Sequence, residues 1–288
     1  MAGHRLHVLK PDRSALTPAD LLRSAHNGEI ELHAAAGAAE AMTVGTALYS
    51  GEFPRVAFAN YLTDVRLPPG ARLLPGISAA DAFAQVEAFF AERATACFHW
   101  QPAGTPGDPS FDALGAHLAG LHWRPRTHRY FVLPTLIALP GRSDLTLIPA
   151  RASFEKLREL LDAVVAADTD TDSDADAETR RQWVDALLTQ LDDTRLDGFL
   201  ALAGTDPVGH VRLSTHGELG HISGLLVHPG HRRQRVAATL LMSLCDLAAR
   251  ARLRHLTLCV RAEDAPAIAL YERLGFAPLG ERLIWCRP

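Results

Sequence analysis

The feature that most constrains this chain is an apolar strand, an arginine-rich turn and an amphipathic helix that follow one another directly in its second half. The strand covers Ile222–Val227, and the turn contains Arg232, Arg233 and Arg235. Backbone N–H groups in the first turn of a helix have no internal partner, and the helix dipole adds about half a positive charge there. The segment therefore predicts a phosphate-binding site at the amino end of a helix that begins near Val236.

A second motif lies downstream, where the sequence reads DAPAIALYERLGF from Asp264 to Phe276. Its periodicity predicts a short helix with Pro266 in the first turn and Gly275 at the C-terminal stop. Tyr271 falls within this helix. On residue pattern alone, such a tyrosine is also explained as a half-buried side chain whose hydroxyl group is hydrogen-bonded.

The order strand, HP, R-x-x-x-x-A, helix, strand and DAPAIALYERLGF resembles the GNAT superfamily of acetyl-CoA-dependent N-acetyltransferases. In that family the first segment is the pyrophosphate loop, usually R/Q-x-x-G-x-G/A. The second segment is a helix that carries an Asn and a Tyr. The resemblance covers roughly the last half of the chain. Arg235 stands where the family usually has Gly, and Asp264 stands where it usually has Asn. A Cβ at position 235 predicts a cradle for the pyrophosphate that is looser or that relies on the Arg side chain, whereas Ala237 keeps the small residue.

The resemblance implies acetyl-CoA as co-substrate, with no metal. Pantetheine would pair like an added strand with the splayed end of Ile222–Val227, and the N–H of Val227 would hold the oxyanion. Tyr271 is implied as the acid that protonates the leaving thiolate, since a phenol of pKa about 10 still carries its proton at neutral pH. The implied cofactor-binding residues are Leu225, Leu226, Val227, Arg232, Arg233, Gln234, Arg235, Val236, Ala237, Ala238, Asp264 and Tyr271.

The group that accepts the amine proton has three candidates, which are His221, Ser223 and His228. Strict alternation along the strand would place His221, Ser223 and Leu225 on one face. The resemblance implies His221 as the catalytic base, because some relatives carry a histidine at such a position of this strand. An ordered water with no single base is the alternative.

The length of 288 residues exceeds one core of typical size and predicts two domains. A punctuated segment centred on Pro140 and Gly141 suggests the domains 1–140 and 141–288. The second half predicts strands at 145–148, 198–203, 208–214 and 221–227, helices at 153–167 and about 178–193, and the elements named above. We therefore expect an α/β (α+β) fold with a mixed, mostly antiparallel sheet flanked by helices, the GNAT acyl-CoA N-acyltransferase fold.

The first half repeats part of the second at a shift of 153 positions. Leu274, Phe276, Pro278, Arg282 and Ile284 then fall on Leu121, Trp123, Pro125, Arg129 and Phe131. A helix at 81–93 and a strand at 96–100 likewise mirror a helix at 236–250 and a strand at 255–260. The pattern predicts two tandem copies, the first a degenerate GNAT-like domain. A chance recurrence of the helix and strand order is the alternative.

Composition and charge argue against several classes of protein. The net charge of −4 argues against a nucleic-acid binder, and no apolar run approaches the roughly 18 residues of a membrane span. The N-terminus lacks the apolar core of a signal peptide, so a cytoplasmic location is expected.

The four cysteines predict reduced core thiols rather than disulfides or zinc ligands. The acidic stretch 168–178 lacks the spacing of a calcium loop and predicts a solvated acidic loop. The resemblance implies that this loop lies over the acceptor pocket, where a negative lid would attract a cationic amine.

The combined expectation is an N-acetyltransferase. It would transfer the acetyl group of acetyl-CoA to a primary amine of a small molecule or a peptide, by direct attack in a ternary complex. The alternative is a non-catalytic acyl-CoA-binding or regulatory module, which the departures at Arg235 and Asp264 would suit.

Overall fold

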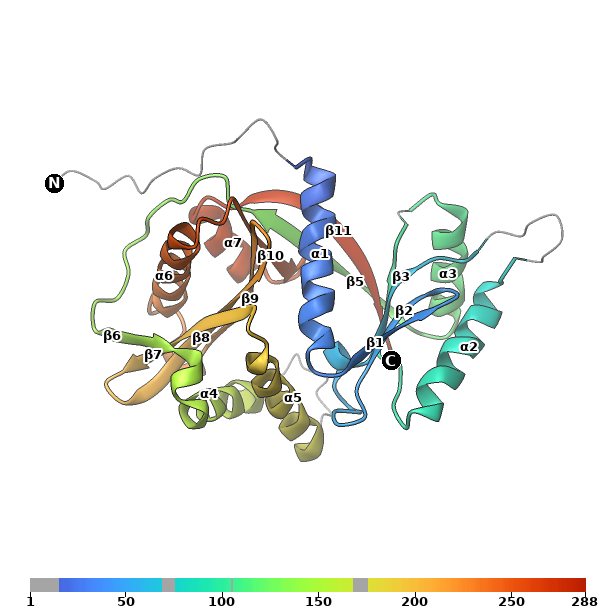
Figure 1. Cartoon of the computed structure of the whole chain (residues 1–288), viewed down its shortest axis with the longest axis horizontal. Coiled ribbons are helices and arrows are strands. Elements are labelled where there is room, and N and C mark those ends of the chain that lie inside the picture. Colours follow the sequence, from blue (N-terminus) through green and yellow to red (C-terminus); the bar gives the residue numbers. More distant parts are fainter. Residues whose placement is uncertain (1–15, 69–75, 105, 168–175) are drawn as a thin grey trace. The chain divides into compact units, whose positions relative to one another are not determined.

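The computed structural model describes residues 16–68, 76–104, 106–167 and 176–288 (Figure 1). The chain divides into two compact units. The first comprises Met1–Leu32 and Arg129–Glu281, and the second comprises His33–His128 and Arg282–Pro288. The units therefore differ from the consecutive domains 1–140 and 141–288, because an early helix belongs with the second half of the chain and the C-terminal residues belong with the first.

The first unit contains a mixed sheet whose strand order is β11-β5-β10-β9-β8-β7-β6. Strands β6 to β9 pair antiparallel with their neighbours, and β10 runs parallel to β9. This is the mixed, mostly antiparallel sheet that the sequence predicts. The strand bounds are β5 Arg124–Val132, β6 Leu145–Pro149, β7 Leu196–Ala203, β8 Asp206–His216, β9 Leu219–Val227, β10 His255–Arg261 and β11 Ala277–Cys286. Strands β5 and β11 contribute residues to both units.

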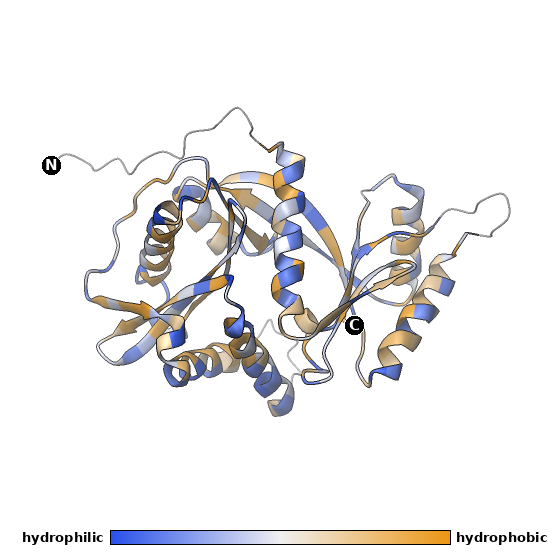
Figure 2. Ribbon diagram, viewed as in Figure 1, coloured by the Kyte–Doolittle hydropathy of each residue, from blue (hydrophilic) through white to orange (hydrophobic). Residues whose placement is uncertain are grey.

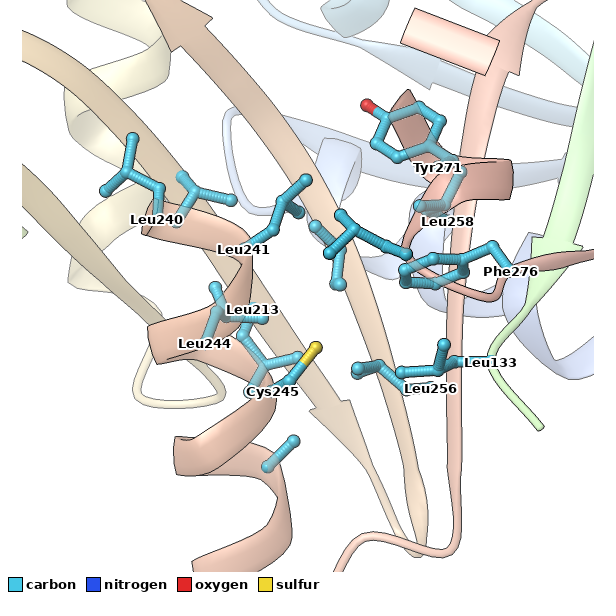
Figure 3. Packing of buried hydrophobic residues seen from close by; sticks show 14 of the residues in the cluster. Leu133, Leu213, Leu240, Leu241, Leu244, Cys245, Leu256, Leu258, Tyr271 and Phe276 are labelled. Carbon is cyan, nitrogen blue, oxygen red and sulfur yellow. The ribbon is translucent and has the colours of Figure 1, made fainter. Parts of the chain in front are cut away.

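Helices α6 (Val236–Arg250) and α7 (Ala265–Arg273) cover one face of this sheet. Figure 3 shows their apolar side chains meeting those of the strands in one packed core. Leu240 and Leu244 of α6 are fully buried. Helix α6 lies so close to β8 that a Cβ on Gly209 would come within 2.6 Å of a Val236 methyl group. The close approach fixes the amino end of α6 against the sheet.

Helices α4 (Phe154–Ala167) and α5 (Ala177–Thr189) cover the opposite face at β7 and β8. Helix α1 (Pro18–Ala34) covers that face at β5, β9, β10 and β11, where Leu21 and Ala25 pack on Tyr130 and Leu219. Figure 2 shows hydrophilic and hydrophobic residues alternating along α1, as expected of a helix with one buried face. Short 3₁₀ turns η2 (Ala150–Ala152), η3 (Gln190–Asp192) and η4 (Pro229–His231) join these elements.

The second unit is a smaller sheet with two helices. Its core brings together Val86 and Phe90 of α2, Leu114 of α3, and Trp100 and Trp285 of the strands. The elements are β1 Ala38–Met42, β2 Gly45–Tyr49, η1 Ala57–Ala59, β3 Tyr61–Val65, α2 Ala79–Glu92, β4 His99–Pro102 and α3 Pro109–Gly120, with the start of β5 and the end of β11.

The two units repeat one order of elements. The series β3, α2, β4, α3, β5 matches the series β9, α6, β10, α7, β11. In both series the two strands on either side of the first helix pair parallel. The helix predicted at 81–93 is α2, whereas the strand predicted at 96–100 begins only at His99. The tandem duplication itself stays a prediction, and the matching order is what it requires.

Two further expectations from the sequence concern membrane-spanning helices and the acidic stretch 168–178. Within the described residues, no helix combines the length and apolar character needed to cross a membrane. The acidic stretch predicted to act as a lid lies largely outside the described residues, which resume at Asp176. There the Asp176 carboxylate caps α5 by accepting a hydrogen bond from the Thr179 N–H at 2.8 Å.

Candidate functional site

Strands β9 and β10 part along their length. Their parallel pairing covers only residues 219–222 of β9 and 255–258 of β10, although β9 runs on to Val227 and β10 to Arg261. Beyond Ile222 and Leu258 the facing backbone edges therefore do not pair with each other. Such unpaired edges can accept an extended ligand as an added strand. The parting lies where the sequence predicts the pantetheine site.

A β-bulge interrupts β9 at the same place. Ser223 pairs with Arg212 and Leu226 with His210, so Gly224 and Leu225 together face one residue of β8. Gly224 takes a φ of +56°, a conformation that side chains disfavour. The extra residue changes which side chains share a face.

The faces predicted from strict alternation are therefore wrong beyond the bulge. Leu225 and Val227 pack with the core under α6 and α7, whereas Leu226 packs with the core under α4 and α5. Ser223 consequently shares its face with Leu226 and not with Leu225. The sequence signal was the glycine at position 224, since an isolated Gly in a strand often marks a bulge.

The backbone of Val227 is oriented toward the parting. The next N–H, that of His228, donates to the carbonyl oxygen of Val208 on β8 at 3.0 Å. Donors alternate in direction along a strand, so the Val227 N–H is directed away from β8. This is the orientation that the predicted oxyanion contact requires.

The arginine-rich turn leads directly into α6. Arg233 and Arg235 each adopt a left-handed conformation with φ of +63°, and Arg235 is the N-cap residue without any side-chain cap. Arg232 and Gln234 are exposed beside them. The first backbone bond of the helix runs from Thr239 N–H to the Arg235 carbonyl oxygen at 3.1 Å. The N–H groups of Val236, Ala237 and Ala238 thus have no partner within the helix and are available to an anion.

Arg142 adds a residue that the sequence interpretation missed. It lies in the segment before β6, which was read only as a domain boundary. Its backbone N–H donates to the Thr239 hydroxyl at 2.9 Å, and its Nη1 donates to the Gln234 side chain at 3.1 Å. The contacts place a fourth arginine beside the predicted phosphate loop. No local motif marked it, because the contact joins segments that are distant along the chain.

Tyr271 lies in α7 at the border of the main core. Its ring packs against that of Phe276, with centroids 5.9 Å apart (Figure 3). The Phe131 ring lies on it as well, with a centroid 6.5 Å away. The residue is 7% exposed, and burial raises the pKa of its phenol, with the charges of Asp264 and Cys259 acting in the same direction. A phenol with a raised pKa keeps its proton at neutral pH and remains a donor.

Asp264 caps α7. Its carboxylate accepts a hydrogen bond from the Ala267 N–H at 3.1 Å. Aspartate and asparagine are both good N-cap residues, so the departure from the usual Asn keeps this local function.

His221 is buried among polar partners, being only 1% exposed. Its Nδ1 lies 3.0 Å from the Thr257 hydroxyl, and its Nε2 lies 3.3 Å from the Glu29 carboxylate. The other Glu29 oxygen accepts a hydrogen bond from the Tyr130 hydroxyl. The other two base candidates are placed differently. Ser223 has a buried hydroxyl without a partner among the described residues, and His228 Nδ1 accepts from the Gly230 N–H.

Glu29 comes from α1, far from His221 in sequence, and no motif predicted it. Burial would raise the pKa of its carboxyl, but hydrogen bonds from His221 and Tyr130 and the charges of His221 and His26 outweigh burial. The pKa of Glu29 therefore lies well below its usual range. A histidine and an ionised carboxylate in contact can hold and pass a proton.

Comparisons with known proteins point to one family. A model described as acetyltransferase (GNAT) family matches residues 157–276. No curated protein matches the sequence. Among solved structures, a conserved protein of unknown function from Staphylococcus epidermidis is similar, with a TM-score of 0.61, 13% identity, and coverage of 85% of this chain and 91% of that one. A GCN5-related N-acetyltransferase from Kribbella flavida has a TM-score of 0.56, 15% identity, and coverage of 92% and 95%. These two likenesses concern the fold.

Arg235 permits a test of the turn. A non-glycine residue in the left-handed region costs about 1–2 kcal/mol, whereas glycine adds about 0.5–1 kcal/mol of entropy loss on folding. We expect Arg235→Gly to leave the free energy of unfolding unchanged or to raise it by up to about 1 kcal/mol. Arg235→Val should lower it, because a β-branched residue is least tolerated there. Thermal and urea unfolding measure both, and a less stable Gly variant would contradict the conformation described.

Glu29 permits a test of the buried pair. We expect Glu29→Gln to lower the free energy of unfolding by about 1–3 kcal/mol at pH 7, since hydrogen bonds to a charged group are lost. The folded pKa is depressed, so this stabilisation is complete above the ordinary glutamate pKa of about 4.5 and is lost as the pH falls further. Urea unfolding at pH 7 and 3.5 measures it. The exposed Glu159→Gln is the control, and a difference independent of pH would refute the pairing.

Proposed function

We propose that this chain, which matches the acetyltransferase (GNAT) family over residues 157–276, transfers the acetyl group of acetyl-CoA to a primary amine. The observation that carries the proposal is the combination, in one unit, of an uncapped helix amino end with the parted strands β9 and β10. The helix end suits a diphosphate, and the parted edges suit an extended amide-containing chain. Coenzyme A joins these two chemical parts in one molecule.

The cofactor-binding residues follow from this arrangement. The diphosphate would contact the N–H groups of Val236, Ala237 and Ala238, with charge from Arg232 and its neighbours. Arg142 would hold the loop through Gln234. Pantetheine would pair with β9 from Leu225 to Val227. The Leu225 and Val227 side chains then anchor that backbone in the core under α6 and α7.

The reaction proceeds by direct attack in a ternary complex. The amine nitrogen attacks the thioester carbonyl carbon, and the oxygen of the tetrahedral intermediate takes the negative charge near the Val227 N–H. The carbon–sulfur bond then breaks, and the sulfur leaves with the electron pair and takes a proton from Tyr271. The nitrogen loses one proton, so that an amide and free CoA thiol result. The proton on the phenol is restored from the one that the amine released.

His221 is the residue that we assign to the amine proton, with the Glu29 carboxylate holding the imidazole in place. The imidazole shares its face of β9 with Ser223, beside the parting. Because His221 is 1% exposed, the proton would reach it through a bridging water rather than by direct contact with a bulky acceptor. The acceptor itself is a small-molecule amine or a peptide amine.

The anion site is tested with coenzyme A. We expect Arg232→Ala to weaken CoA binding by about 1–3 kcal/mol, the size of a charge-assisted phosphate contact. Titration calorimetry at fixed ionic strength measures the dissociation constant. Arg250→Ala, at the other end of the same helix and also exposed, is the matched control and should bind CoA as the unaltered chain does. An unchanged constant for Arg232→Ala would remove that side chain from the site.

Catalysis is tested by thiol release from acetyl-CoA across a panel of amines. We expect Tyr271→Phe to lower kcat by about 10²- to 10⁴-fold while the CoA dissociation constant stays unchanged, because only proton donation is lost. His221→Asn should also lower kcat, because the group that takes the amine proton is removed. Tight CoA binding without turnover on any amine would favour the alternative, a non-catalytic acyl-CoA-binding module.

A further inference from the structure

Arg212 is a buried cation on β8, at the centre of the first unit. Its residue exposure is 7%, and the guanidinium faces the layer of α4 and α5. Removing a charge from water costs several kcal/mol unless a partner compensates it. Burial alone lowers the pKa of Arg212 to about 10, which still leaves it charged at neutral pH. The apolar residues around Arg212 therefore do not explain why a charged side chain is kept at this buried position.

No compensating charge is present among residues 16–68, 76–104, 106–167 and 176–288. The guanidinium makes one hydrogen bond there, from Nη1 to the Gln190 side-chain oxygen at 2.7 Å. Its Nε has no partner in this part of the chain. Gln190 itself is neutral and is fixed by its Nε2, which donates to the Leu32 carbonyl oxygen at 3.2 Å. One edge of the guanidinium is thus held, and the other is left unused.

The unused edge faces the bulge in β9. A Cβ on Gly224 would lie 2.6 Å from Arg212 Nε and 3.1 Å from Nη2. The absence of a side chain at position 224 therefore lets the backbone of the bulge lie against the edge that carries Nε and Nη2, where any side chain would displace the guanidinium. This edge presents two parallel N–H donors, the geometry that fits both oxygens of a carboxylate.

Two further polar side chains, those of His210 and Ser223, have buried polar atoms next to Arg212. His210, two residues before Arg212 on the same face, is 3% exposed, and burial and the charge of Arg212 lower its pKa to about 3. It is neutral at physiological pH and does not repel a cation or an anion. The Ser223 hydroxyl, on the residue paired with Arg212, has no partner among the described residues. A donor hydroxyl and a cation thus flank the same bulge.

The position connects Arg212 to the reaction. The bulge belongs to the segment of β9 that parts from β10, and His221 lies on the same strand two residues before Ser223. An anion bound by Arg212 would therefore sit beside the thioester if the proposed function holds. A carboxylate near the reacting carbonyl has two possible sources, the acceptor amine and the acyl group of the donor.

We propose that Arg212, with the Ser223 hydroxyl, binds a carboxylate carried by one of the two reacting substrates. The acceptor would then be an amino acid or a peptide-like amine with a nearby carboxylate, or the donor would be a dicarboxylic acyl-CoA. This inference rests on the proposed function for the identity of the ligand. The binding of a carboxylate by Arg212 does not depend on it.

Matched substrates distinguish the two sources. L-Tyrosine is compared with tyramine, L-lysine with cadaverine and L-phenylalanine with phenethylamine as acceptors of acetyl-CoA, and succinyl-CoA is compared with propionyl-CoA as donor. We expect kcat/KM to favour the carboxylate-bearing member of one set by about 100-fold or more, because its absence leaves a buried charge unpaired. Equal rates within every pair would overturn the proposal.

Two variants test whether Arg212 is responsible. In Arg212→Met the preference should fall to within a few-fold of one, while the rate with the uncarboxylated partner stays within a few-fold. Arg212→Lys keeps the charge but lacks the two-donor edge, so it should also lose most of the preference. Arg158→Gln removes an exposed arginine of α4 as the control. Equal losses on both members of a pair would overturn the proposal.

Stability and binding give readouts that need no turnover. An arginine kept for a ligand should leave Arg212→Met as stable as the unaltered chain or more so, since an unpaired buried charge is removed. A fall of more than about 5 °C in the melting temperature would identify a structural arginine and overturn the proposal. Succinate and each amino acid should raise the melting temperature of the unaltered chain but not of Arg212→Met, against sodium chloride of equal ionic strength. Shifts without any turnover would keep the proposal and reject the acetyltransferase function, and no shift with any carboxylate would overturn the proposal.

Discussion

The site depends on the separation of two parallel strands beyond Ile222 and Leu258. A sheet normally uses every backbone donor and acceptor along its strands, because a buried unpaired group costs free energy. Here β9 meets that requirement on its β8 side while leaving its other side open. The bulge at Gly224 and Leu225 occurs at the same level of the strand, where β9 still pairs with β8 but no longer with β10. The parting and the bulge thus lie together, and they bring an open strand edge close to the buried guanidinium of Arg212.

The two faces of the sheet have different physical character around this opening. Under α6 and α7 the contacts are almost wholly apolar, with Leu240 and Leu244 fully buried. Beneath α1, α4 and α5 the strands instead bury His210, Arg212 and His221. Buried polar groups lower the stability of a core unless they are paired. Their concentration on one face of the sheet is therefore typical of a functional site. The apolar face holds the helix whose amino end suits a diphosphate, and the polar face carries His221, which we propose takes part in the reaction.

Much of this arrangement could be predicted from the sequence, because it is encoded in contiguous segments. The strand ending at Val227, the helix from Val236 and the helix bearing Tyr271 have local periodicities and caps, and the structure contains all three elements. Glu29, Arg142 and Arg212 were missed for a different reason. Their partners are distant in sequence or lie on another strand, and no spacing rule connects them. The prediction from strict alternation failed at Gly224 because a two-residue repeat does not account for the extra residue of a bulge.

The distribution of strands between the units has a consequence for how such a chain can evolve. The sheet that contains the parted strands uses residues 129–132 of β5, and its polar face is covered by α1, both encoded before the segment that matches the family. The smaller unit in turn takes its final strand residues, which include Trp285, from the very end of the chain. Neither half of the coding sequence therefore encodes all the residues of one compact unit. Gene fission between the halves would thus leave each product without residues that complete its own unit.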